Sequence, residues 1–159
     1  MAAQTRPLVP SLRVILLLVA VMLAGLAAGQ ARAFEQSQLT ITTATGTHAF
    51  TIEIARSPQE QALGLMHRRE LADDYAMLFP FTQPREASFW MRDTYVSLDM
   101  VFIAQGGVVH RIERATEPLS LRSVRSRGPV IAVLEFVAGT ADRIGLAPGD
   151  VVIHGDLQR

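Results

Sequence analysis

The chain has 159 residues with 15 basic and 15 acidic side chains, so its formal net charge is zero. Every basic residue is arginine, and cysteine is absent. The lack of cysteine excludes disulfides, thiol chemistry and thiolate metal sites.

The first 33 residues predict a secretory signal peptide. Arg6 and Arg13 precede the apolar run "VILLLVAVMLAGLAA" (residues 14–28), and the small-residue exit "ARA" ends at Ala33. We therefore expect cleavage before Phe34 and a periplasmic or extracellular location in a bacterium. An uncleaved anchor is the alternative, because about 20 apolar residues span a bilayer. No later segment is long and apolar enough to cross a membrane.

Residues 34–159 are predicted to form one domain of ordinary size. Removing the leader also removes three arginines, which leaves 12 basic residues against 15 acidic ones. A mildly acidic domain has no general affinity for nucleic acid, so we expect no nucleic-acid partner. The oligomeric state cannot be read from the sequence.

The first elements of this domain are a hairpin and a helix. Residues 39–45 and 48–55 have β-type patterns and flank Gly46-Thr47, which predicts a β-hairpin. Ser57, followed by Pro58 and by Glu60 three residues after the cap, forms a capping box. It predicts a helix from about Pro58 to His67.

The rest of the chain alternates short strand patterns with turn signals. Strands are predicted at residues 75–81, 87–93, 98–104, 108–114, 130–136 and 151–154, and a short helix capped by Thr140 at 139–145. Pro80 and Pro84 restrict the first of these strands to an edge or end it. Residues 114–129 are expected to be the longest loop. The fold class is therefore mainly β: a single antiparallel β-sandwich or small barrel with one or two short helices.

The stretch "ASFWMRDTYVSLDMVFIA" (residues 87–104) places charged side chains and the chain's one tryptophan among apolar residues. If its two strands pair around a four-residue loop, Arg92 faces Asp99, and Trp90 can stack on the guanidinium. Arg92–Asp99 would then be an internal ion pair that fixes the hairpin. Alternatively, Trp90, Arg92 and Asp93 line a cleft that binds a ligand.

Four blocks in order, "GLMHRREL", "AMLFPF", "FWMRDTYVSLDMVFI" and "VLEFVAGTADRIGLAPGD", resemble the bacterial and archaeal family known as domain of unknown function 192. The resemblance covers about residues 53–152 and implies a compact, mostly β domain with no assigned activity. The chain departs from the family pattern at Ala76, where glycine is usual, and at Ser97, where proline is usual. The family's motif marks these positions: Gly64, Met66, Arg68, Trp90, Met91, Arg92, Asp93, Thr94 and Asp99.

The candidate binding surface joins the unusual stretch to the segment around Met66. Its members are Met66, Arg68, Trp90, Arg92, Asp93, Thr94 and Asp99. A flat aromatic group beside an arginine and acids suits a polar ligand such as a sugar, an envelope polymer or a peptide. A hydrolase that uses Asp93 or Asp99 as general acid or base is the first alternative. An envelope scaffold without a small ligand is the second.

No metal or cofactor is expected. The four histidines are scattered, with no pair at ligand spacing on one element. Met66, Met77, Met91 and Met100 suit copper(I) chemically, but they occupy positions that pattern as core. Five arginines lie between residues 111 and 127, with Glu113 and Glu117 interspersed, which indicates either a solvated loop with local ion pairs or an anion site.

Overall fold

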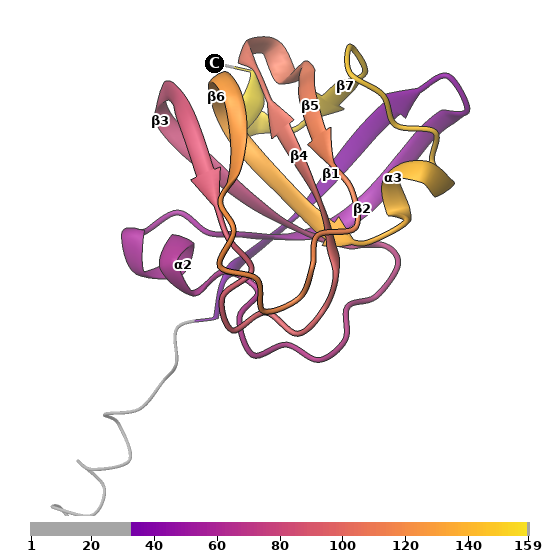
Figure 1. Cartoon of the computed structure of the whole chain (residues 1–159). Coiled ribbons are helices and arrows are strands. Elements are labelled where there is room, and N and C mark those ends of the chain that lie inside the picture. Colours follow the sequence, from indigo (N-terminus) through magenta and orange to yellow (C-terminus); the bar gives the residue numbers. More distant parts are fainter. Residues whose placement is uncertain (1–32, 159) are drawn as a thin grey trace, which may run out of the picture. The chain divides into compact units, whose positions relative to one another are not determined.

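The computed structural model describes residues 33–158, so the predicted leader lies outside the described part except for Ala33. The unit from Phe34 onward contains one curled sheet and two short helices (Figure 1). The strands are β1 (Glu35–Thr43), β2 (Gly46–Ile54), β3 (Tyr75–Phe89), β4 (Leu98–Ile103), β5 (Val109–Glu113), β6 (Val124–Val137) and β7 (Val151–Ile153). The helices are α2 (Pro58–Leu63) and α3 (Thr140–Arg143), and 3-10 turns lie at Gln105–Gly107 and Gly155–Leu157. Within residues 33–158, no helix has the length and apolar character needed to cross a membrane.

The seven strands form one sheet in the order β5-β4-β6-β3-β2-β1-β7. The sheet curls into a half-barrel, and β3 and β6 bend strongly within it (Figure 1). All pairs are antiparallel except β2 with β3, which are parallel. The predicted mainly-β fold class with two short helices is confirmed.

The predicted first hairpin is present as β1 and β2. Its turn is Ala44-Thr45 rather than Gly46-Thr47, because Thr43 pairs with Gly46 and the second strand begins at that glycine. Phe50, Ile52 and Ile54 all face the core, as their spacing predicts for one face of a strand.

Helix α2 begins as predicted and ends early. The Glu60 backbone N–H donates to Ser57 Oγ at 3.2 Å, and the Ser57 N–H donates to the Glu60 carboxylate at 2.8 Å, which is the predicted capping box. The helix stops at Leu63, not at His67, because Gly64 has a positive φ of 47°. A side chain there would also meet the Phe79 ring at 3.2 Å, so both backbone conformation and close packing favour glycine.

The two prolines do not end β3, which continues to Phe89. Pairing of β3 with β2 stops at Leu78, so the missing N–H of Pro80 falls where the strand has only β6 as neighbour. The register with β6 is then interrupted between Pro80 and Arg85. Strand β6 begins at Val124, so the expected long loop is shorter than predicted.

The inner strands β3, β4 and β6 bury side chains on both faces of the sheet. On β6, Leu134 and Phe136 belong to one core cluster, whereas Val133 belongs to the other. On β4, Val101 and Ile103 contribute to the first cluster, and alternate residues contribute to the second. The second cluster includes Leu65 from the segment after α2, and the candidate site lies on its side of the sheet.

Candidate functional site

A pocket of about 260 Å³ lies between α2, with the residues that follow it, and the turn after β3 at residues 90–94. One wall is formed by residues 61–66, and the opposite wall by the end of β3 with Trp90 and Arg92. Glu135 of β6 and Leu98 of β4 also line it. The volume is small for a ligand site, so the pocket suits a small molecule or one end of a larger one.

The segment after β3 forms a tight turn that exposes two side chains beside the pocket. The Thr94 N–H donates to the Met91 carbonyl at 3.1 Å, and the Thr94 hydroxyl donates to the Arg92 carbonyl at 3.1 Å. Asp93, between them, has a positive φ of 54°. Trp90 is 48% exposed, and the Arg92 guanidinium carbon lies 4.3 Å from the centroid of its ring. The predicted stacking of Arg92 on Trp90 is therefore confirmed.

One backbone hydrogen bond joins the two walls. The His67 N–H donates to the Asp93 carbonyl at 2.8 Å, which holds the segment around Met66 against the turn after β3. His67 itself has a positive φ of 65°. The sequence predicted that these two segments meet, and the structure shows that they do.

The expected Arg92–Asp99 pair is wrong. Strand β4 does not pair with residues 87–93, because β6 lies between β3 and β4 in the sheet. The only ion pair of Arg92 within the described chain is with Asp93, at 3.8 Å, and both side chains are about half exposed. The short loop before β4 therefore does not close a hairpin.

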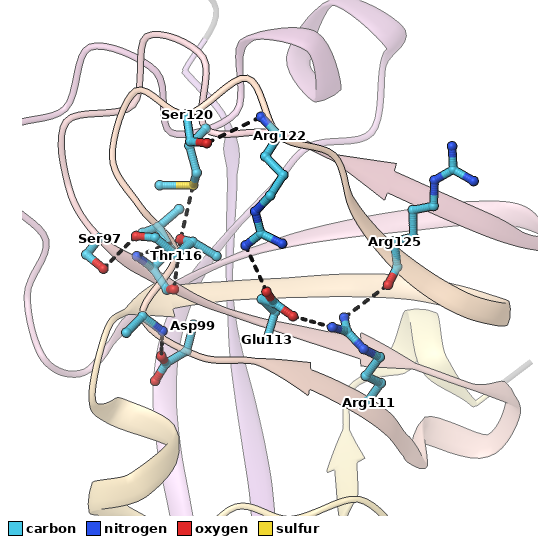
Figure 2. A network of polar contacts seen from close by, with 11 residues as sticks. Ser97, Asp99, Arg111, Glu113, Thr116, Ser120, Arg122 and Arg125 are labelled. Atoms are coloured by element: carbon cyan, nitrogen blue, oxygen red, sulfur yellow. Dashed lines mark hydrogen bonds and ion pairs between the residues drawn. The ribbon is translucent and has the colours of Figure 1, made fainter.

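Asp99 has a structural position instead. It is 1% exposed, and its two carboxylate oxygens accept hydrogen bonds at 2.9 Å from the N–H groups of Ala115 and Ala141. Figure 2 shows Asp99 with one of these two bonds. Ala115 has a positive φ of 49°, and Ala141 lies in α3. Asp99 thus holds a strained loop position and the start of α3, where Thr140 makes no cap of the kind we expected.

Arg68 does not line the pocket either. It forms an ion pair with Glu53 of β2 and donates to the Tyr75 hydroxyl at 2.9 Å, while that hydroxyl donates to Glu53 at 3.0 Å. Burial raises the pKa of Tyr75 far above its usual value, so the phenol stays protonated. Arg68 ties the loop after α2 to the sheet.

The seven candidate residues therefore separate into two groups. Those that line the pocket are Met66, Trp90, Arg92 and Thr94. Those that do not are Arg68, Asp93 and Asp99. The four pocket residues come from two segments that sequence reasoning placed on one surface.

Like Arg85, Glu135 lines the pocket and was missed by sequence reasoning. It is 4% exposed, and among residues 33–158 its carboxyl has no hydrogen-bond or ion-pair partner. Burial raises its pKa from 4.5 to about 8, so it is mainly protonated at neutral pH. The signal in the sequence was the single acid in the apolar run "VIAVLEFV".

The arginine-rich loop forms local ion pairs. Glu113 pairs with both Arg111 and Arg122, and Arg111 also donates to the Arg125 carbonyl at 3.0 Å (Figure 2). These ion pairs with Glu113 make the guanidinium groups of Arg111 and Arg122 less available to an outside anion. The two arginines in turn hold the pKa of Glu113 below its usual value. The described residues contain no group of three or more histidine, aspartate or glutamate side chains suited to a metal.

A curled β half-barrel with a small lateral pocket is the class of domain that these features define. Residues 40–154 match DUF192, a family described as an uncharacterized ACR, and the chain belongs to this family. No curated protein matches it.

Two solved structures are similar to this chain. A protein from Sinorhizobium meliloti 1021, described as a "putative transcription regulator", is 40% identical with a TM-score of 0.77, over 79% of this chain and 98% of that one. A protein of unknown function from Novosphingobium aromaticivorans DSM 12444 is 37% identical with a TM-score of 0.76, over 79% of this chain and 90% of that one. Neither description names a ligand, so the family fixes the fold and leaves the activity open.

Proposed function

We propose that this chain is an exported binding domain that takes a small polar ligand in the pocket between residues 61–66 and Trp90. The observation that carries the proposal is the convergence of three side chains on one small cavity: a half-exposed tryptophan, a stacked arginine and a buried acid that has no partner among residues 33–158. Structural side chains of this kind are normally satisfied within the protein. An aromatic surface and a few polar groups around a concave site are typical of ligand recognition.

The hydrolase that was the first alternative has less support. Asp99 is held by two backbone N–H groups and does not line the pocket, and Asp93 is 53% exposed beside Arg92. Binding therefore fits the geometry better than catalysis by these aspartates.

The test is a thermal-shift screen of sugars, organic acids, amino acids and short peptides. Ala62 is exposed on α2 and lines the pocket, so Ala62→Phe fills the mouth with little cost to the fold. Gln59→Phe, also exposed on α2 but outside the pocket, is the matched control. We expect a ligand to raise the midpoint of the wild type and of Gln59→Phe, but not of Ala62→Phe.

The opposite result is equally clear. If no compound stabilises the protein, or if Ala62→Phe responds as strongly as Gln59→Phe, the pocket is not the binding site. The envelope scaffold without a small ligand would then be the better description. Export is tested separately by the N-terminus of the purified protein, which we predict to be Phe34.

A further inference from the structure

Building on the proposed binding function, we propose that the ligand is a small organic acid with a second, neutral oxygen acceptor. Arg85 and Arg92 at the pocket receive its carboxylate, and the protonated carboxyl of Glu135 donates a hydrogen bond to the acceptor. The inference rests on the positions of these three side chains around one cavity. It assigns a ligand class and gives Glu135 a role in recognition.

The placement of Glu135 follows from the alternation of β6. Val133, two residues earlier, belongs to the core cluster on the pocket side, whereas Leu134 and Phe136 belong to the cluster on the other face. The cross-strand neighbours of Glu135 are Met77 on β3 and Met100 on β4, and neither carries a charge. The carboxyl thus projects among apolar side chains toward the pocket that it lines.

The charged groups near Glu135 can be followed element by element. Along the pocket, β3 contributes Arg85 and the turn after it contributes Arg92, while residues 61–66 contribute no titratable side chain. On β4, Asp99 lies next to Met100, but backbone N–H groups bind both of its oxygens away from the pocket. The titratable and charged groups lining the pocket are therefore two cations and one acid.

This charge pattern favours an anion over a cation. Arg85 stacks on Phe81 at 3.9 Å and has no acidic partner within residues 33–158, and Arg92 has only the 3.8 Å contact with Asp93. Two guanidinium groups repel a cationic ligand, whereas they can bind a carboxylate through paired N–H donors. A protonated acid offers an O–H donor, which an anionic oxygen or a carbonyl can accept.

The size of the pocket favours a free acid. About 260 Å³ is small for a ligand site, so a short acid fits as a whole, whereas a longer molecule would place only one end there. A carboxylate at the arginines and a carbonyl at Glu135 would occupy the two polar ends, with an apolar body against Trp90 and Met66. N-Benzoylglycine has these three features and serves as the probe.

Fluorescence of Trp90 reports binding directly, because it is the chain's one tryptophan and lines the pocket. Protein purified from cells expressing the full-length chain is titrated at pH 6.5 with N-benzoylglycine, its neutral amide and N-(2-aminoethyl)benzamide. The three compounds have nearly the same shape, and they are an anion, a neutral molecule and a cation, respectively. We expect the acid to bind at least ten-fold more tightly than either analogue. Acetyl-trialanine tests the other source of a carboxylate: tighter binding than N-benzoylglycine would overturn the assignment to a free acid.

Variants separate the two polar ends of the site. Arg85→Gln with Arg92→Gln should weaken the acid at least ten-fold, whereas Arg125→Gln, outside the pocket, should change its affinity less than two-fold. Affinities are compared rather than signal amplitudes, since Arg92 contacts the fluorophore. An unchanged affinity in the double variant would overturn the proposal.

The pH dependence isolates Glu135. With a pKa of about 8, its protonated fraction falls from about 0.9 at pH 7 to about 0.1 at pH 9, so the dissociation constant of the acid should rise about ten-fold. Glu135→Gln keeps a donor and cannot ionise, so it should bind the acid with no such rise. A wild-type affinity that is flat over this range would remove Glu135 from the site.

Failure of this inference and failure of the binding function give different results. If the amine analogue binds best and its affinity rises toward pH 9, Glu135 is the counter-ion of a cation, and the organic acid is overturned while the pocket remains a binding site. If none of the three probes binds, the organic acid is again overturned. The pocket itself is then judged by whether Ala62→Phe abolishes the response to any compound in the screen.

Discussion

Replacing Glu135 with glutamine should make the stability of this protein less dependent on pH. The carboxyl is 4% exposed, and burial raises its pKa from 4.5 to about 8. Between pH 4.5 and about pH 8, the carboxyl is therefore protonated in the folded protein and ionised in the unfolded chain. Stability contributed by the protonated form is complete below pH 4.5 and is lost as the pH rises through 8.

The size of the effect follows from the two pKa values. The two pKa values differ by about 3.5. A difference of one pKa unit corresponds to roughly 1.4 kcal/mol, so the free energy of unfolding changes by up to about 5 kcal/mol. Over the middle of the window, the free energy of unfolding of the wild type should fall by up to about 1.4 kcal/mol per pH unit relative to Glu135→Gln. Glutamine has nearly the same shape, so packing changes little.

The assay is urea unfolding followed by far-UV circular dichroism at pH 5, 6, 7 and 8. The difference between wild type and Glu135→Gln removes the contributions of histidines and other groups common to both. Glu113→Gln is the control, because its two arginines hold the pKa of that carboxyl below the usual value, outside this window. A wild-type minus Glu135→Gln difference that stays within about 0.5 kcal/mol from pH 5 to 8 would refute the reasoning.

Three further predictions concern the unusual stretch and the leader. Asp99→Asn should lower the free energy of unfolding by about 2–4 kcal/mol, because an amide has one oxygen and cannot accept hydrogen bonds from both backbone N–H groups as the carboxylate does. The control Asp93→Asn, at an exposed position, should change it by less than about 0.5 kcal/mol. Urea unfolding measures both changes. Arg92→Ala should lose less than about 1 kcal/mol, since its ion pair is exposed, and a fall of the thermal midpoint well beyond 10 °C would contradict this. Mass spectrometry of the protein purified from bacterial cells should give Phe34 as the first residue, and an intact chain beginning at Met1 would contradict the predicted cleavage.

Local signals in the sequence predicted most of the fold. Alternation predicted the β1–β2 hairpin, and the capping box at Ser57 predicted the start of α2. Strand order was not predictable in the same way, because it depends on contacts between distant parts of the chain. Strand β4 pairs with β6, which begins more than 20 residues later in the chain. Strand β6 therefore takes the place beside β4 that we expected for residues 87–93.

The candidate site shows the same division. The motif residues Met66, Trp90 and Arg92 could be placed on one surface from the sequence. Their true partners could not, because the register that put Arg92 opposite Asp99 assumed a hairpin of neighbouring strands. Once β6 lies between those strands, Asp99 is free to bind backbone N–H groups on the far side of β4.

Glu135 could have been recognised from the sequence, because it is an acidic residue within an apolar strand pattern. A central strand buried on both faces accommodates Val, Leu or Phe at every position, and an acid without a partner lowers stability there. Glutamine or methionine at this position would keep the volume and remove the ionisable group. Stability alone gives no reason for a carboxyl beside Met77 and Met100, whereas a ligand that accepts its proton in a hydrogen bond does.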